Sequence, residues 1–224
     1  MSLLAFTQVP LSAHASTSFT LDVPERHTVA VLGDEDSGVG RLGGYALGLE
    51  RPPAGSARLF DTVVADLPQP ERLAFRRRVG YLPAGDSLLQ NLTLRQNVAL
   101  PLRFGSEAAP REIDTRVGIM IAAVRLGKAA DRRPAQANEE EVRRAAFARA
   151  MAFDPALLIL EQPFDGLTHR AAAELLEVAR GGETAAGARR TIFITGQELP
   201  LLIQRRVDSV YRLAKSGSLE LEAV

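Results

Sequence analysis

The chain has 224 residues, enough for one well-buried domain and too few for a second full one. Lysine plus arginine equals aspartate plus glutamate at 27 each, so the net charge gives no support for a nucleic-acid partner or an anionic-membrane partner. With 46% hydrophobic residues and no cysteine, the composition indicates a globular protein without disulfides or thiolate metal sites, as suits a reducing compartment.

Two segments near the N-terminus alternate between apolar and polar residues. Leu3 to Gln8 and Ser18 to Val23 follow the period of two that is typical of half-exposed antiparallel strands, so we expect an antiparallel edge of three strands. The start of the chain lacks the basic residues and long apolar run of a secretory signal. No apolar run approaches the roughly 20 residues of a membrane-spanning helix. We therefore expect a cytoplasmic protein.

Three short apolar runs predict buried parallel strands. Thr28 to Leu32 is rich in β-branched residues and ends at a glycine, and Leu157 to Leu160 and Thr191 to Ile194 have the same character. Helical patterns separate these runs. An alternation of buried strands and helices is typical of an α/β fold.

The apolar spacing becomes helical between Asn91 and Ala152. One helix face is predicted by the spacing of Ile113, Val117, Met120, Ile121 and Val124. Asp131 to Pro134 interrupts this pattern, and a second helix is expected from Asn138 through Arg149. The sequence thus predicts one domain over 1–224, with a core made of 1–90 and 151–224 and a helical subdomain at 91–150.

Five segments in fixed order resemble the nucleotide-binding subunits of ABC transporters over nearly the whole chain. They are Val29–Leu49, Gly80–Ala84 with Asn91–Val98, Pro134–Ala150, Asp154–Leu167 and Thr191–Leu199. The resemblance implies a P-loop NTPase-like core with an antiparallel β edge and a helical subdomain. It also implies ATP hydrolysis at two sites of a head-to-tail dimer, where each site joins the phosphate loop of one subunit to the signature helix of the other.

The segment at the position of the family's phosphate loop keeps the glycines but loses the charge. Gly33 and Gly38 hold the glycine spacing of G-x-x-x-x-G-K-[ST], whereas the lysine position is Val39 and the hydroxyl position is Gly40. The candidate residues of this vestigial loop are Gly33, Ser37, Gly38, Gly40 and Arg41.

The acidic residues of this loop predict weak or absent phosphate binding. Asp34, Glu35 and Asp36 repel phosphate, and their side chains can accept hydrogen bonds from the loop's own N–H groups. Arg41 follows the lysine position by two residues, and we expect it to pair with Asp34 or Asp36. The loop's donors should then be occupied by the protein's own acids.

The signature segment of the family, LSGGQ, aligns with Ala137 to Glu141. Glu139 and Glu140 oppose an approaching phosphate by shape and charge. Asn138 is a favoured N-cap, and Glu141 at the third helical position completes a capping box. We therefore expect the helix to remain and its anion site to be filled by these side chains.

Four further positions of the family's ATP chemistry differ as well. Glu161 stands where the family places its magnesium-binding aspartate, and it can still reach a hydrated Mg²⁺. Gln162 stands at the position of the water-activating glutamate, and an amide cannot act as a base. Ala84 and Gln197 stand where the family has a metal-binding glutamine and a switch histidine.

These losses favour a catalytically silent homologue that acts as a structural or regulatory subunit of an ABC membrane complex. That hypothesis assigns no catalytic residue, no metal residue and no cofactor. The alternative is an unusual but working ATPase with ATP and Mg²⁺, in which Arg41, Glu161 and a group from a partner restore activity. A third hypothesis is a free-standing interaction or regulatory protein that has this fold without the family's activity.

One segment predicts a membrane-protein partner. Leu88 to Leu102 resembles the part of the family's subunits that receives the coupling helix of a transmembrane subunit. The sequence from Leu126 to Asp131 is similar to that of family members that handle lipids and lipoproteins. The candidate partner-binding residues are Leu88, Asn91, Leu94, Arg95 and Asn97. We expect a second nucleotide-binding subunit or another copy as a further partner, no nucleic acid, and a place on the inner face of the membrane.

Overall fold

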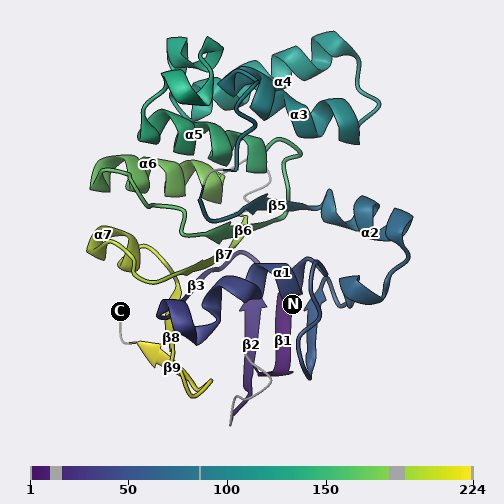
Figure 1. The fold of residues 1–224 in the computed structure, drawn as a ribbon, viewed down its shortest axis with the longest axis vertical. Coiled ribbons are helices and arrows are strands. Elements are labelled where there is room, and N and C mark those ends of the chain that lie inside the picture. Colours follow the sequence, from purple (N-terminus) through teal and green to yellow (C-terminus); the bar gives the residue numbers. More distant parts are fainter. Residues whose placement is uncertain (1, 11–16, 86, 182–189, 223–224) are drawn as a thin grey trace.

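The structure is a computed structural model that describes residues 2–10, 17–85, 87–181 and 190–222 (Figure 1). Its larger sheet has six strands in the order β5-β6-β7-β3-β8-β9, all parallel to their neighbours except β9, which is antiparallel to β8. The bounds are β5 Val79–Leu82, β6 Leu157–Glu161, β7 Thr191–Gly196, β3 Thr28–Leu32, β8 Ser209–Leu213 and β9 Leu219–Glu222. Every residue of β3, β6 and β7 is buried, which explains their continuously apolar sequences.

A second, three-stranded antiparallel sheet has the order β2-β1-β4. It consists of β1 Ser2–Val9, β2 Phe19–Pro24 and β4 Ser56–Leu59. Residues of β2 alternate between buried and exposed, as their period of two predicts. The rings of Phe6 and Phe193 lie 5.7 Å apart, so the two sheets share one apolar core.

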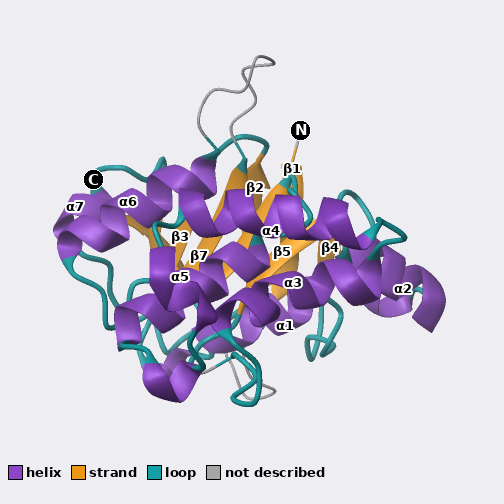
Figure 2. Cartoon of the chain, turned by 90° about the horizontal axis from the view of Figure 1, so that it is seen from above, coloured by secondary structure: helices purple, strands orange, loops and turns teal. Residues whose placement is uncertain are grey.

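The helices lie mainly on the other face of the large sheet (Figures 1 and 2). They are α1 Leu42–Ala46, α2 Gln69–Arg76, α3 Leu94–Gly105, α4 Pro110–Ala123, α5 Glu139–Ala150, α6 His169–Arg180 and α7 Leu201–Gln204. Short 3-10 turns occur at Glu35–Ser37, Val39–Arg41, Val64–Asp66, Gly127–Asp131 and Pro134–Gln136. A second apolar core joins α3, α4, α5 and α6 to that face of the sheet.

The expected α/β fold with an antiparallel β edge is confirmed. Ile113, Val117 and Ile121 form the buried face of α4, as their spacing predicts. The helices α3, α4 and α5 all lie within 91–150, while the division of the chain into a core and a subdomain stays a prediction. In the part of the chain that the structure describes, no helix has the length and apolar character needed to span a bilayer.

Candidate functional site

The loop after β3 folds as two 3-10 turns joined at Gly38. Gly38 has φ +79° and ψ +8°, a left-handed conformation that glycine adopts without strain. The Ser37 hydroxyl donates to the Asp34 carbonyl at 2.5 Å, and it accepts from the Val39 N–H at 3.3 Å. Serine and backbone groups therefore close this loop.

The acidic residues of the loop point outward. Asp34, Glu35 and Asp36 are exposed, and the Asp36 carboxylate pairs with the Lys215 ammonium at 3.3 Å. Carboxylates that remain in water keep their hydration and gain little by turning inward. The expectation that these acids occupy the loop's donors is therefore wrong, since the Ser37 N–H donates to the Asp34 carbonyl and the Val39 N–H donates to the Ser37 hydroxyl.

Arg41 lies along α1 and away from the acids of the loop. Its guanidinium donates twice to Glu50 Oε2, at 3.2 and 2.9 Å, and lies 5.2 Å from the centre of the Tyr45 ring. The expected pairing with Asp34 or Asp36 is wrong, because the turn at Gly38 directs the next residues into α1, toward Glu50.

Two neighbours of Arg41 differ in the space around them. Val39, at the lysine position, is only 5% exposed and belongs to the apolar core between the sheets. Gly40, at the hydroxyl position, is exposed, and a Cβ added there would meet no heavy atom within 4 Å. The loop therefore has open space where the family's magnesium-binding hydroxyl would lie.

Glu161 ends β6 and is buried, with 7% of the residue exposed. Its Oε2 accepts from the Ala84 N–H at 3.2 Å, while Oε1 is buried and has no partner at hydrogen-bonding geometry among the described residues, although the Tyr81 hydroxyl lies near enough to the carboxylate to stabilise its charge. Burial raises the pKa of Glu161, although the Ala84 N–H and the Tyr81 hydroxyl oppose this shift. Burial beside Glu161 also raises the pKa of Tyr81. An unpartnered carboxylate oxygen is a ligand that suits Mg²⁺.

Glu161 also contacts the helix that follows the loop. A Cβ added to Gly43 in α1 would collide with Glu161 Oε1 and lie 3.3 Å from the Tyr81 ring. The glycine therefore makes room for the glutamate, which is one methylene longer than the aspartate of the family. The structure thus brings Glu161 beside the start of α1.

Gln162 and Gln197 lie at the same edge of the sheet as the loop. Gln162 has φ +44°, and its N–H donates to the Thr195 carbonyl at 2.7 Å. It lines a pocket of about 260 Å³ with Pro163, Phe164, Asp165, Glu198, Leu199 and Pro200. Gln197 is exposed, and the carbonyl of the preceding Gly196 accepts from the Gly33 N–H at 2.9 Å. The carboxyl ends of β3, β6 and β7 thus meet, as in the ligand sites of open parallel sheets.

The predicted capping box of the signature segment is confirmed. Asn138 Oδ1 accepts from the Glu141 N–H at 2.8 Å, and Glu141 Oε2 accepts from the Asn138 N–H at 3.0 Å. Glu139 packs against Gly166 in the turn after β6. Glu140 forms an ion pair with Arg144 at 2.8 Å. The acids of this helix start are thus held by contacts within the chain.

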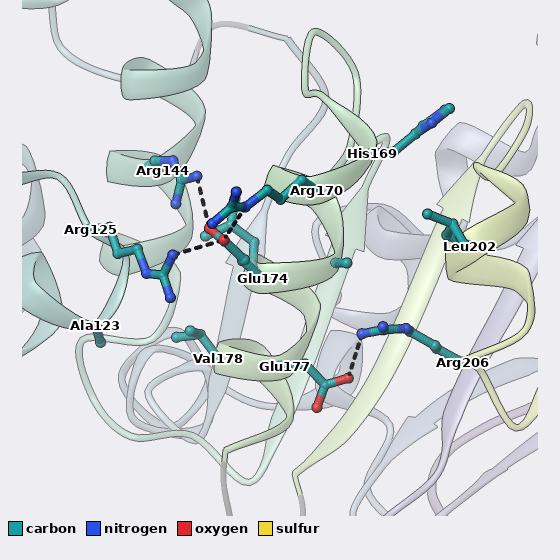
Figure 3. A pocket seen from close by; sticks show the side chains of 12 residues that line it. Ala123, Arg125, Arg144, His169, Arg170, Glu174, Glu177, Val178, Leu202 and Arg206 are labelled. Carbon is teal, nitrogen blue, oxygen red and sulfur yellow. Dashed lines mark hydrogen bonds and ion pairs between the residues drawn. The ribbon is translucent and has the colours of Figure 1, made fainter.

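A larger pocket, of about 540 Å³, lies away from these residues, between α5, α6 and α7 (Figure 3). Arg125, Arg144 and Arg170 converge on the Glu174 carboxylate at 2.8, 3.4 and 3.0 Å (Figure 3). The hydrogen bond from Arg170 is the main cause of the lowered pKa of Glu174. Because its cations are paired with acids, we interpret this pocket as an ion-pair network that joins α5 to α6.

The predicted partner-binding residues divide between the surface and the core. Asn91 and Arg95 are exposed, whereas Leu88, Leu94 and Asn97 are buried. The Asn97 amide bonds to backbone groups of the loop before α3, so its role in the structure is to shape that loop. Contact of these residues with a partner stays a prediction.

A groove borders this segment, between α2, β5, α3 and the end of α5. Its volume is about 440 Å³, and Leu73, Pro101, Phe104 and Phe153 contribute to its wall. Leu73 is 51% exposed and Phe104 83% exposed. Large apolar side chains this exposed are unusual outside contact surfaces when they gather in one place.

The chain is similar in sequence to known ATP-binding proteins. A family model described as ABC transporter matches residues 17–165. The sulfate/thiosulfate import ATP-binding protein CysA of Yersinia pestis is 34% identical over 163 residues, covering 70% of this chain and 42% of that protein. The lipoprotein-releasing system ATP-binding protein LolD of Pseudomonas syringae pv. tomato is 28% identical over 210 residues, covering 93% and 90%. The chain thus spans less than half the length of the sulfate importer's subunit.

Solved structures confirm the expected P-loop NTPase-like fold, and they include two of the ATP-binding cassette MJ0796. Its dimeric structure has a TM-score of 0.83 at 21% identity, with 98% of this chain and 97% of that chain covered. The same cassette in a post-hydrolysis state, bound to ADP and Pi, has a TM-score of 0.82. The expectation of a catalytically silent subunit is wrong, because the relatives are ATP-binding proteins of import and release systems, and the alternative of a working ATPase agrees better with them.

Proposed function

The chain belongs to the ABC transporter family, and from this premise we propose that it is an ATP-hydrolysing transporter subunit with an altered set of catalytic residues. One observation carries the proposal. Glu161, at the end of β6 and beside the helix that follows the phosphate loop, is buried with one carboxylate oxygen unpartnered. A buried acceptor without a partner is costly to stability, which favours a role in binding a cation.

The N–H groups of the loop other than those of Ser37, Val39 and Arg41, which bond within the loop, would hold the phosphates of ATP in this proposal. The carboxylates of the loop lie outside it, and Gly40 leaves open space. Glu161 would hold Mg²⁺, and the Ala84 N–H orients its carboxylate. When bound, Mg²⁺ would neutralise developing charge on the phosphates. The position of Glu161 therefore suits metal-assisted phosphoryl transfer.

Gln162 has a limited role in this chemistry. Its amide can orient a water by donating and accepting hydrogen bonds, but it cannot take the proton of that water. The proton must then pass to another oxygen, such as one of the γ-phosphate. We therefore expect slower turnover than a glutamate at this position would give.

We further propose a transmembrane subunit as the partner at the groove that Leu73 and Phe104 border. Their exposure, with Asn91 and Arg95 nearby on the preceding loop and α3, supports an apolar contact with a polar rim. This partner would hold the chain at the inner face of the membrane. A second ATPase subunit, identical or different, would complete the sites.

The transported substrate in this proposal is lipid-related. The lipoprotein-releasing relative is matched over 90% of its own length, against 42% for the sulfate importer. This supports a subunit whose length and organisation match those of the lipoprotein-releasing relative.

The test is nucleotide binding and phosphate release by the purified chain. MgATP should bind saturably with a dissociation constant in the micromolar range, and phosphate release should depend on the metal. Glu161→Ala should abolish the metal-dependent part, whereas Glu220→Ala, an exposed carboxylate on β9, should leave it unchanged. A folded chain with no saturable nucleotide signal would contradict the proposal.

A further inference from the structure

A lysine on the turn between β8 and β9 contacts the phosphate loop. The chain has lysine only at Lys128 and Lys215. Lys215 Nζ lies 3.3 Å from Asp36 Oδ2 in the loop. Arg41, the cation two residues after the lysine position, is held by Glu50 and by the Tyr45 ring. Lys215 is therefore a cation that reaches the loop from outside it.

The topology of the sheet fixes this approach. β8 pairs in parallel with β3, with Arg212 opposite Leu32, so both strands end at the same edge. A Cβ placed on Gly33 would lie 3.0 Å from the Leu213 carbonyl oxygen. The backbone of Lys215 is two residues further on, which places its side chain beside the loop.

The turn that carries Lys215 is well defined. The Ala214 N–H donates to the Ser218 carbonyl at 2.9 Å, and the Gly217 N–H donates to the Ala214 carbonyl at 2.8 Å. Gly217 has φ +90°, a conformation that favours glycine. Backbone hydrogen bonds thus fix the base of the lysine, and its side chain is 64% exposed.

The pair between Lys215 and Asp36 is exposed. The side chain of Lys215 is 64% exposed and that of Asp36 is 80% exposed. Exposed ion pairs contribute little to stability, so the ammonium can exchange Asp36 for another anion at small cost. A triphosphate carries more charge than one carboxylate and offers several oxygens to the three donors of an ammonium.

We propose that Lys215 supplies the phosphate-binding ammonium that the loop lacks at Val39. The inference rests on the proposed function, because it requires ATP to bind at the loop. Lys215 leaves Asp36 when the nucleotide enters and donates to a phosphate oxygen.

The test is ATP binding by the purified full chain, measured by calorimetry with and without Mg²⁺. Lys215→Met should raise the dissociation constant about tenfold or more, as loss of a charge-assisted hydrogen bond predicts. Lys128→Met, the matched control in the helical region, should leave it unchanged. Lys215→Arg should restore most of the affinity. A Lys215→Met dissociation constant within twofold of wild type overturns the inference.

A second variant separates phosphate contact from neutralisation of Asp36. Asp36→Asn should tighten ATP binding, because it removes a repelling charge and frees Lys215. In the Asp36→Asn background, Lys215→Met should still weaken binding about tenfold if the ammonium contacts phosphate. If the effect of Lys215→Met disappears in that background, the lysine only neutralises Asp36 and the inference is wrong.

The two proposals fail in different ways. Saturable ATP binding that none of the Lys215 variants changes overturns only the role of Lys215. Absence of ATP binding in the folded wild-type chain overturns the proposed function, and the inference falls with it. Thermal unfolding of each variant, which should match that of wild type because Lys215 is exposed, shows that the chain is folded.

Discussion

Asn97→Ala should destabilise the chain, although the sequence indicated a surface residue there. Asn97 is fully buried. Its Oδ1 accepts from the Leu89 N–H at 2.8 Å, and its Nδ2 donates to the carbonyls of Leu89 and Thr93 at 3.0 Å each. The amide therefore joins α3 to the loop that precedes it.

The magnitude follows from these three bonds. Each contributes about 1 kcal/mol net, and backbone groups left buried without a partner add to the loss, so we expect about 2–4 kcal/mol in the free energy of unfolding. With a urea dependence of about 2 kcal/mol per molar, the midpoint should fall by about 1–2 M. Asn97→Asp keeps the acceptor but loses both donors, so a substantial loss should remain.

The assay is urea unfolding followed by far-UV circular dichroism, with Arg95→Ala as the matched control on the same helix. Arg95 is exposed and pairs with Asp131 at 3.0 Å, so its removal should change the unfolding free energy by less than about 1 kcal/mol. If the Asn97→Ala midpoint matches that of Arg95→Ala, the reasoning from the buried amide is refuted.

Three other changes have distinct expected outcomes. Burial raises the pKa of Glu161 above its ordinary value near 4.5, so the folded chain holds that proton more tightly and stability falls as pH rises through this range. Glu161→Gln should remove that slope in urea midpoints measured from pH 4.5 to 8, and an unchanged slope would contradict the shift. Gly40→Ser should alter the unfolding free energy by less than about 0.5 kcal/mol and strengthen MgATP binding measured by calorimetry, because a side chain at this position meets no heavy atom within 4 Å; unchanged affinity would contradict a metal-binding role for that hydroxyl. Arg144→Met should lower the free energy of unfolding by about 3 kcal/mol, because Arg144 is 8% exposed and its charge is paired. Arg170→Met should lower it little, because the Arg170 side chain is 85% exposed. Equal losses in the two unfolding curves would refute the buried network.

The sequence predicted the buried strands well, because parallel strands covered on both faces are continuously apolar. It gave no sign of β4, since Ser56 to Leu59 is short and half polar, and its place beside β1 depends on a long-range pairing. The antiparallel edge was therefore expected, but its third strand was not identified. The helix from Asn138 was predicted because capping depends on neighbouring residues.

The contacts of the site were harder to predict than its residues. Arg41 pairs with Glu50, nine residues away, because the turn at Gly38 sets the direction of α1. Asn97 bonds to backbone groups, which leave no signal in a sequence. Lys215 reaches the loop only because β8 lies beside β3. Each of these contacts depends on tertiary structure, which residue type and spacing do not define.

The contact between Gly43 and Glu161 has a consequence for sequence variation among relatives of this chain. The longer carboxylate uses the volume that any side chain at position 43 would need. A relative that carries glutamate at the end of this strand should therefore keep glycine in the facing helix, while one with aspartate there can accept alanine or serine. The residue types at positions 43 and 161, which are 118 residues apart in the chain, are therefore expected to covary.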